Sequence, residues 1–147
     1  MKFGNEEGGS LVEFAIASLL LIMMLFGIIE FSFAFYGYHF TAEAAKEAAR
    51  YASVRGSNAC TTANPNLADY CLTGAGDNTR ITALVAGLGY PGINSANTTA
   101  QLSLPDGDNA VGHNVKVDVY YTFPIAVPYW KATRLQMHST AQMVISN

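Results

Sequence analysis

The sequence predicts an α+β protein, in which one long N-terminal helix packs on a small antiparallel β-sheet. Three observations predict it. An apolar run continues without a helix breaker into an alanine-rich, charged segment, so residues 8–55 form one helical pattern. Residues 114–123 and 135–145 alternate apolar and polar side chains, as half-buried strands do. Residues 98–104 form a third, shorter candidate strand before a strong turn signal.

The composition excludes some classes of function. The chain has 147 residues, a net charge of −3 and a pI near 5.5, and it has no run of Lys and Arg. There is no basic field to hold phosphates, so we expect no nucleic-acid partner. Much of the apolar excess lies in residues 11–40. The remaining part, about a hundred residues, is large enough to bury a modest core.

The apolar run is long enough to cross a membrane. Residues 14–29 carry no charge, and the run reaches Phe40 if Glu30 is tolerated. This exceeds the hydrophobic region of a typical signal peptide. A helix over residues 8–55 would be about 70 Å long, so it would begin in a membrane and end well outside it. Two alternatives stay open: signal-peptidase cleavage after the small pair Ser32 and Ala34, and a helix buried in a soluble protein.

Small residues form a stripe along this helix. At 100° steps, eight positions fall within an arc of about 80°: Gly27, Glu30, Ala34, Gly37, Thr41, Ala45, Ala48 and Ala52. Small residues allow another backbone to approach closely. We expect the members before Thr41 to pack on a neighbouring helix in a membrane or filament, and the later ones to pack on the chain's own sheet. The alternative for residues 44–52 is that alanine simply favours helix.

Glu30 lies on the same arc. An isolated charge in hydrocarbon is expensive, so we expect Glu30 to be protonated or to have a partner. Tyr36 and His39 are not on its face, and the leading hypothesis is therefore a contact with another subunit. The alternative is a tilted or shifted helix that brings Glu30 to the membrane surface.

The two cysteines predict a disulfide. Cys60 and Cys71 are eleven residues apart in a loop-like segment rich in Gly, Asn and Thr. No histidine or second cysteine pair lies near them to complete a zinc site. One disulfide would place the C-terminal part in an oxidising compartment and would stabilise it by about 3 kcal/mol. Two unpaired buried thiols are the alternative.

The first eight residues, MKFGNEEG, are polar and end in glycine directly before the apolar run. Glu13 lies five residues after Gly8, and a carboxylate just inside a membrane segment usually has a partner. A glycine junction with glutamate at the fifth mature position is the arrangement of type IV pilin-like precursors. The resemblance implies that a prepilin peptidase cuts between Gly8 and Gly9. The new α-ammonium group would then neutralise Glu13 on the same or a neighbouring subunit.

The resemblance extends along the helix. Its matching elements are Gly9–Phe14, Gly27–Phe31 and the alanine-rich segment Ala44–Ala52. This segment resembles the TadE-like family of pseudopilins, or minor pilins, from tight-adherence (Tad/Flp) pilus systems. The family commonly has a proline where this chain has Ser18, so we expect the helix to run without a kink here.

The resemblance implies a domain organisation and a set of partners. Residues 1–8 would be the leader peptide, residues 9–40 the transmembrane part of the helix, and residues 41–147 a pilin-like outer domain. The protein would cross the inner membrane once, with its N-terminus cytoplasmic and its outer domain periplasmic or extracellular. Its partners would be the prepilin peptidase, other pilins or pseudopilins, the pilus-assembly machinery and the membrane.

The outer domain has further local signals. Asp77-Asn78-Thr79 is a candidate cap for a helix over residues 80–88, whose apolar residues recur on one face: Ile81, Leu84, Val85 and Leu88. Pro105-Asp106-Gly107-Asp108 is a turn. Pro124 and Pro128 are expected to end the second strand, and residues 125–131, with Trp130, to form a connecting loop.

No catalytic set is evident, and we expect neither a cofactor nor a metal. Asp106, Asp108 and Asn109 lack the twelve-residue calcium pattern with its closing Glu, and turn chemistry explains them better. The three histidines, His39, His113 and His138, are scattered. A different function stays open: a membrane-anchored ligand-binding module that uses the loops Asp106–His113 and Pro124–Trp130. A third possibility is a secreted enzyme accessory.

Overall fold

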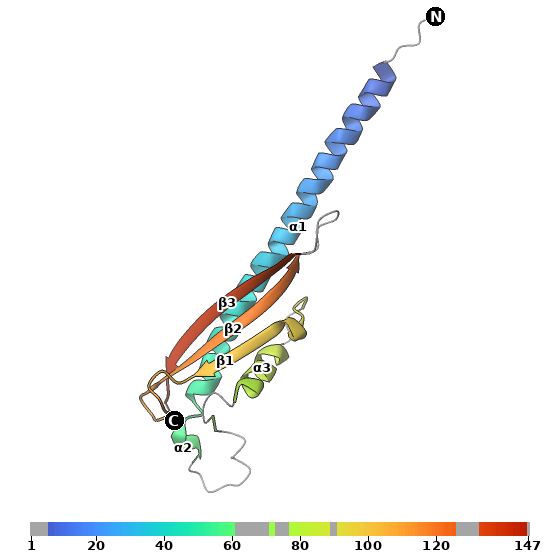
Figure 1. Ribbon diagram of the computed structural model, residues 1–147. Coiled ribbons are helices and arrows are strands. Elements are labelled where there is room, and N and C mark those ends of the chain that lie inside the picture. The colour runs from blue at the N-terminus through green and yellow to red at the C-terminus, as the bar shows by residue number, and fades with distance from the viewer. Residues whose placement is uncertain (1–5, 61–70, 73–76, 89–90, 126–132, 147) are drawn as a thin grey trace, which may run out of the picture.

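The structure, a computed structural model, describes residues 6–60, 71–72, 77–88, 91–125 and 133–146. Its elements are α1 (Glu6–Ser53), α2 (Ser57–Cys60), α3 (Asn78–Gly87), the 3₁₀ turn η3 (Ser95–Asn97), β1 (Thr98–Ser103), β2 (Asn114–Ile125) and β3 (Thr133–Val144). Figure 1 shows α1 as a long rod, with its C-terminal half against the sheet, mainly β2 and β3, and its N-terminal half projecting away. The predicted α+β class is confirmed.

Helix α1 has 48 residues and is continuous through Ser18. The Ser18 hydroxyl donates a hydrogen bond to the carbonyl oxygen of Ala15, 2.9 Å away, inside the helix. The predicted uninterrupted helix is therefore confirmed, with ends within two residues of those expected. The helix also passes through Gly8 and Gly9, and the proposed cleavage point does not coincide with a change of secondary structure.

The sheet is antiparallel in the order β1-β2-β3. All three predicted strands are present, but the prediction that Pro124 ends the second strand is wrong, because β2 continues to Ile125. The carbonyl of Lys116 faces β1, since the Ser103 hydroxyl donates to it, and alternation turns Pro124 the same way. The β1–β2 pairing starts at Thr98 opposite Tyr121, so Pro124 lies past the end of β1. Its missing N–H removes no hydrogen bond of the sheet.

The core lies between α1 and the inner face of the sheet. Val115, Val117, Val119 and Tyr121 of β2 are buried, as their alternation predicts. Small residues of α1 cover them: Ala44, Ala45, Ala48, Ala49 and Ala52. Since these side chains are short, the helix backbone can lie close to the sheet. From α3, Ile81 and Val85 are buried while Leu84 and Leu88 pack against the core, which confirms the predicted buried face.

Helix α3 closes the free edge of β1. The side-chain oxygen of Asn78 accepts a hydrogen bond from the backbone N–H of Leu102 at 2.7 Å. The Thr82 hydroxyl accepts a hydrogen bond from the N–H of Ala100 at 3.0 Å and donates one to the carbonyl oxygen of Ala100 at 3.2 Å. The predicted capping role is wrong for Asp77, which makes no side-chain capping hydrogen bond. Asn78 instead pairs with a backbone N–H at the edge of β1, where unpaired backbone groups would otherwise be exposed.

Candidate membrane and assembly surface

The projecting half of α1 is apolar on all sides. Large hydrophobic side chains are exposed from Leu11 to Tyr38, and the most apolar 18-residue window has a mean hydropathy of 2.5 with none of it buried in the protein. A soluble monomer rarely exposes a contiguous apolar surface of this extent. α1 is long and apolar enough to cross a membrane once, so its exposed half has the properties of a single-pass anchor.

The predicted processing residues lie near the free end of α1, far from the sheet (Figure 1). Gly8, Gly9 and Glu13 are exposed, and a Cβ atom added at either glycine would meet nothing within 4 Å. This end is therefore sterically open to an enzyme or another subunit. Their roles in cleavage and docking stay predictions.

Two members of the small-residue stripe also remain open to a partner. Gly27 is exposed, and a Cβ atom added to it would meet nothing within 4 Å. Glu30 is partly exposed one turn further along α1. The chain's own sheet does not cover Gly27. Packing of Gly27 and Glu30 on a neighbouring helix stays a prediction.

Gly37 requires a correction. A Cβ at this position would lie 3.2 Å from Cε1 of Tyr121 and 3.3 Å from Sδ of Met137. Gly37 thus faces the chain's own sheet, and the expectation that it packs on a neighbouring membrane helix is wrong. The reason is that β2 and β3 extend past Thr41 toward the N-terminal half of α1. The expected boundary after Phe40 therefore falls inside the part of the helix that the sheet covers.

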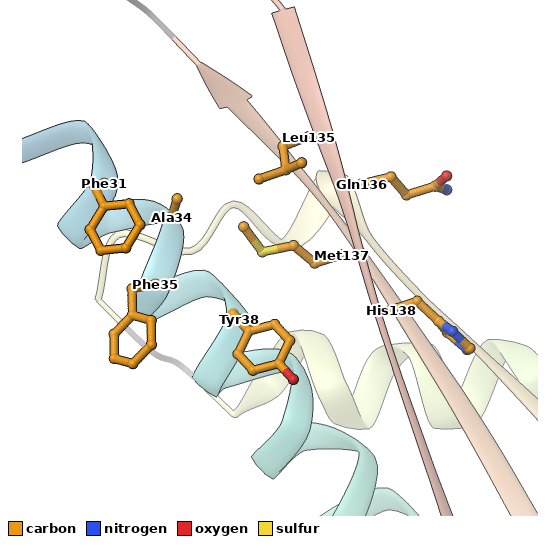
Figure 2. Close-up of a pocket in the computed structure, with 8 residues that line it drawn as sticks. All are labelled: Phe31, Ala34, Phe35, Tyr38, Leu135, Gln136, Met137 and His138. Carbon is orange, nitrogen blue, oxygen red and sulfur yellow. The ribbon is translucent and has the colours of Figure 1, made fainter. Parts of the chain in front are cut away.

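A groove lies where α1 and β3 begin to diverge (Figure 2). Its volume is about 350 Å³, and its walls come from two elements: Phe31, Ala34, Phe35 and Tyr38 of α1, and Leu135, Gln136, Met137 and His138 of β3. Leu135 and Met137 point toward the helix, whereas Gln136 and His138 point to the other side of the strand. Ala34 lines this groove, and its packing on a neighbouring helix stays a prediction. The groove is continuous with the exposed apolar surface of α1.

Comparison with known proteins identifies the helical part of the chain. The family model described as TadE-like protein matches residues 8–50. Residues 8–50 therefore resemble the TadE-like family. No curated protein and no solved structure matches the chain.

The TadE-like segment begins at the predicted cleavage glycine and ends at Arg50, three residues before the end of α1. It contains the exposed apolar half of the helix and most of the small-residue stripe. The sheet and α3 lie outside it. The confirmed family resemblance therefore lies in α1, the helix whose exposed half forms the candidate membrane and assembly surface.

Beyond the TadE-like segment, the outer face of the sheet carries a polar cluster around Asp118. The Lys116 ammonium lies 3.1 Å from Oδ2 of Asp118, and Nε2 of His138 lies 3.0 Å from Oδ1, to which Thr140 also donates. Tyr120 stacks on the His138 ring with centroids 4.5 Å apart. Burial alone would raise the pKa of Asp118, but the hydrogen bonds from Thr140, Lys116 and His138 outweigh it and lower the pKa.

Sequence reasoning missed this cluster. The signal available was the polar half of each alternating strand, which placed these side chains on an outer face. Which of them meet depends on the pairing of β2 with β3, where Asp118 lies opposite Thr140 and Tyr120 opposite His138. That register is not visible in either strand by itself.

The carboxylates of the turn before β2 accept hydrogen bonds from nearby residues of the same turn, as the turn prediction implies. Asp106 accepts hydrogen bonds from the backbone N–H and side-chain amide of Asn114, at 2.6 and 2.9 Å. Asp108 accepts from the N–H of Ala110 at 3.1 Å and pairs with His113. These hydrogen bonds lower the pKa of both carboxyl groups. Within the described ranges, no group of three or more His, Cys, Asp or Glu residues is placed to hold a metal.

The structure describes only one of the two cysteine side chains of the predicted disulfide. Cys71 is half-buried and carries no free thiol, and Arg80 donates a hydrogen bond to its carbonyl oxygen at 3.2 Å. The side chain of Cys60 lies outside the described part of the chain, as do residues 126–132 with Trp130. Pairing of Cys60 with Cys71 therefore stays a prediction.

Proposed function

We propose that this protein is a minor pilin, or pseudopilin, of a Tad/Flp pilus, or a protein that assists assembly of that pilus, with a role in pilus biogenesis and surface adhesion. The observation that carries the proposal is the coincidence of the TadE-like match with α1. The same helix exposes apolar side chains all round its N-terminal half, and in its C-terminal half it buries small residues against the sheet. A pilin needs both, because its helix serves first in the membrane and then in a packed assembly.

The proposed sequence of events is the one that the resemblance to pilin-like precursors implies. The precursor inserts once into the inner membrane, with residues 1–8 in the cytoplasm and the outer domain in the periplasm. A prepilin peptidase hydrolyses the peptide bond between Gly8 and Gly9, leaving a new α-ammonium group on Gly9. Glu13 lies one helical turn away and neutralises that charge on the same or a neighbouring chain. The chemistry belongs to the peptidase, and this chain is its substrate and a building block.

The oxidising outer compartment has its own support. A Cys60–Cys71 disulfide persists outside the cytoplasm and is rare within it. The half-cystine character of Cys71 and the loop-closing spacing of the pair favour the orientation with the sheet outside the cytoplasm.

Mass spectrometry of the membrane-extracted protein tests the proposal. We expect a mature chain that starts at Gly9, and we expect Gly8→Leu to keep its leader because the junction no longer fits a peptidase that cuts after glycine. Gly27→Leu is the matched control, with the same substitution at another exposed helical glycine, and it should be processed normally. An intact Met1 in the wild type, or a start near Phe35, would reject the pilin hypothesis.

The ligand-binding module gains no support from the described loop. In Asp106–His113 both carboxylates are engaged in backbone and turn hydrogen bonds. An intact, unprocessed chain that binds a soluble ligand would favour that alternative.

A further inference from the structure

We propose that the groove between α1 and β3 is a phospholipid site at the surface of the membrane that α1 enters. The proposal rests on the proposed membrane insertion of α1 and adds that the sheet itself contacts lipid. The groove walls are mainly apolar, and one of them continues directly into the exposed surface of the helix.

The length of the charge-free segment of α1 sets the position of the groove relative to the membrane. Its charge-free residues 14–29 rise by about 24 Å, close to a hydrocarbon core of about 30 Å, and Glu13 and Glu30 flank them. Carboxylates are least costly at the edges of the core, so the core is centred on this segment. Phe31 then lies at its boundary. Tyr38, seven residues further along, lies about 10 Å higher, in the headgroup layer.

The distribution of aromatic residues gives the same depth independently. Five exposed aromatic side chains occur within two turns of α1: Phe31, Phe33, Phe35, Tyr36 and Tyr38. The charge-free segment below them has aromatic residues only at Phe14 and Phe26 and is otherwise mainly aliphatic. Tyrosine concentrates at membrane–water interfaces, and Tyr36 and Tyr38 are the first tyrosines of α1. The belt on α1 coincides with the helical wall of the groove.

The other wall brings the sheet to this level. Leu135 is on the inner side of β3 but is still 43% exposed, because α1 has diverged from the strand at that point. An acyl chain from the bilayer fits the apolar side chains of both walls.

A strand from another protein is the competing occupant, because in the described part of the chain no strand pairs with the outer edge of β3. Two observations favour lipid. The length of the charge-free segment places the groove at the membrane surface, and the groove is continuous with the apolar surface of α1. A protein strand would not require the groove to lie at the aromatic belt.

Tryptophan fluorescence in vesicles tests the proposal. The full chain, with Trp130→Phe to remove its one native tryptophan, is reconstituted in phosphatidylcholine–phosphatidylglycerol vesicles whose acyl chains are brominated near the carbonyl or near the methyl end. Single tryptophans are placed in the two groove walls by Tyr38→Trp and Leu135→Trp. Ile22→Trp reports insertion of α1, and Val111→Trp, 47% exposed near the opposite end of the sheet, reports the aqueous phase.

We expect both groove tryptophans to lose more fluorescence than Val111→Trp, with the greater loss for bromine near the carbonyl. Ile22→Trp should lose more for bromine near the methyl end. If Ile22→Trp is quenched while both groove variants behave like Val111→Trp, the lipid site is wrong although α1 is inserted. Groove tryptophans shielded from bromine and also from aqueous acrylamide would indicate a protein occupant and would overturn the proposal. Lack of quenching at Ile22→Trp would reject membrane insertion, and the lipid site with it.

Discussion

Gly37 of α1 lies directly against the ring of Tyr121 on β2, so close that an added Cβ would be 3.2 Å from Cε1 of that ring. Phe40, one turn later, meets the same ring edge-on with centroids 6.0 Å apart. This contact is where the helix leaves its projecting half and becomes part of the outer domain. The position of this end of the sheet therefore determines how much of α1 remains free to lie in a membrane or a filament.

Gly37→Leu should therefore destabilise the outer domain by about 1–3 kcal/mol, because the larger side chain must push the helix from Tyr121 and Met137. Denaturant unfolding in detergent, followed by near-ultraviolet circular dichroism, measures the effect. Gly27→Leu is the matched control, since nothing lies within 4 Å of its Cβ position, and it should leave the midpoint unchanged. Equal midpoints for the two variants would contradict the close contact.

Asn78→Ala should destabilise the fold by about 1–3 kcal/mol, because it leaves the N–H of Leu102 at the strand edge without its acceptor. Thr79→Ala, at an exposed position of the same helix, should change stability by much less. The same unfolding measurement compares the two. Hydrogen exchange at Leu102 should also accelerate in Asn78→Ala, and an unchanged rate would show that water replaces the amide at no cost.

The Asp118 cluster predicts a dependence of stability on acidity. Its hydrogen bonds lower the pKa of Asp118 in the folded state below the ordinary value of 3.8. Such a group contributes stability that is present above the unfolded pKa and is lost as pH falls through the folded pKa. Unfolding midpoints measured from about pH 6 down to about pH 2 should fall, and the fall should be smaller in Asp118→Asn. An identical slope in the variant would exclude Asp118 as a contributor.

Glu30→Gln should reduce the number of pili assembled, because a neutral side chain loses a charged contact worth about 2 kcal/mol per subunit. The prediction applies to the proposed function and is measured by electron microscopy of cells that express the variant. Glu43→Gln is the control, since Glu43 is exposed and pairs only with Lys46 in the described structure. Assembly by Glu30→Gln at the wild-type level would count against a contact between Glu30 and another subunit.

Much of the fold could be predicted from the sequence because its signals are local. The continuous helical pattern of α1, the alternation in β2 and β3, the apolar face of α3 and the turn at Asp106 each lie within one stretch of chain. The prediction for Pro124 was wrong because a proline interrupts a strand only where its N–H would face a neighbour. That depends on where β1 ends, which is a property of another segment.

Periodicity and spacing along the chain were sufficient to specify the long N-terminal helix, the glycine–glutamate pattern at its start and the existence of three strands. What those elements meet was set by the way they pack in three dimensions. Packing placed Gly37 under Tyr121, closed β1 with Asn78, joined Asp118 to His138 and opened a groove beside Leu135. Strand register and helix placement bring together residues that are far apart in the chain, and a local pattern carries no information about such pairs.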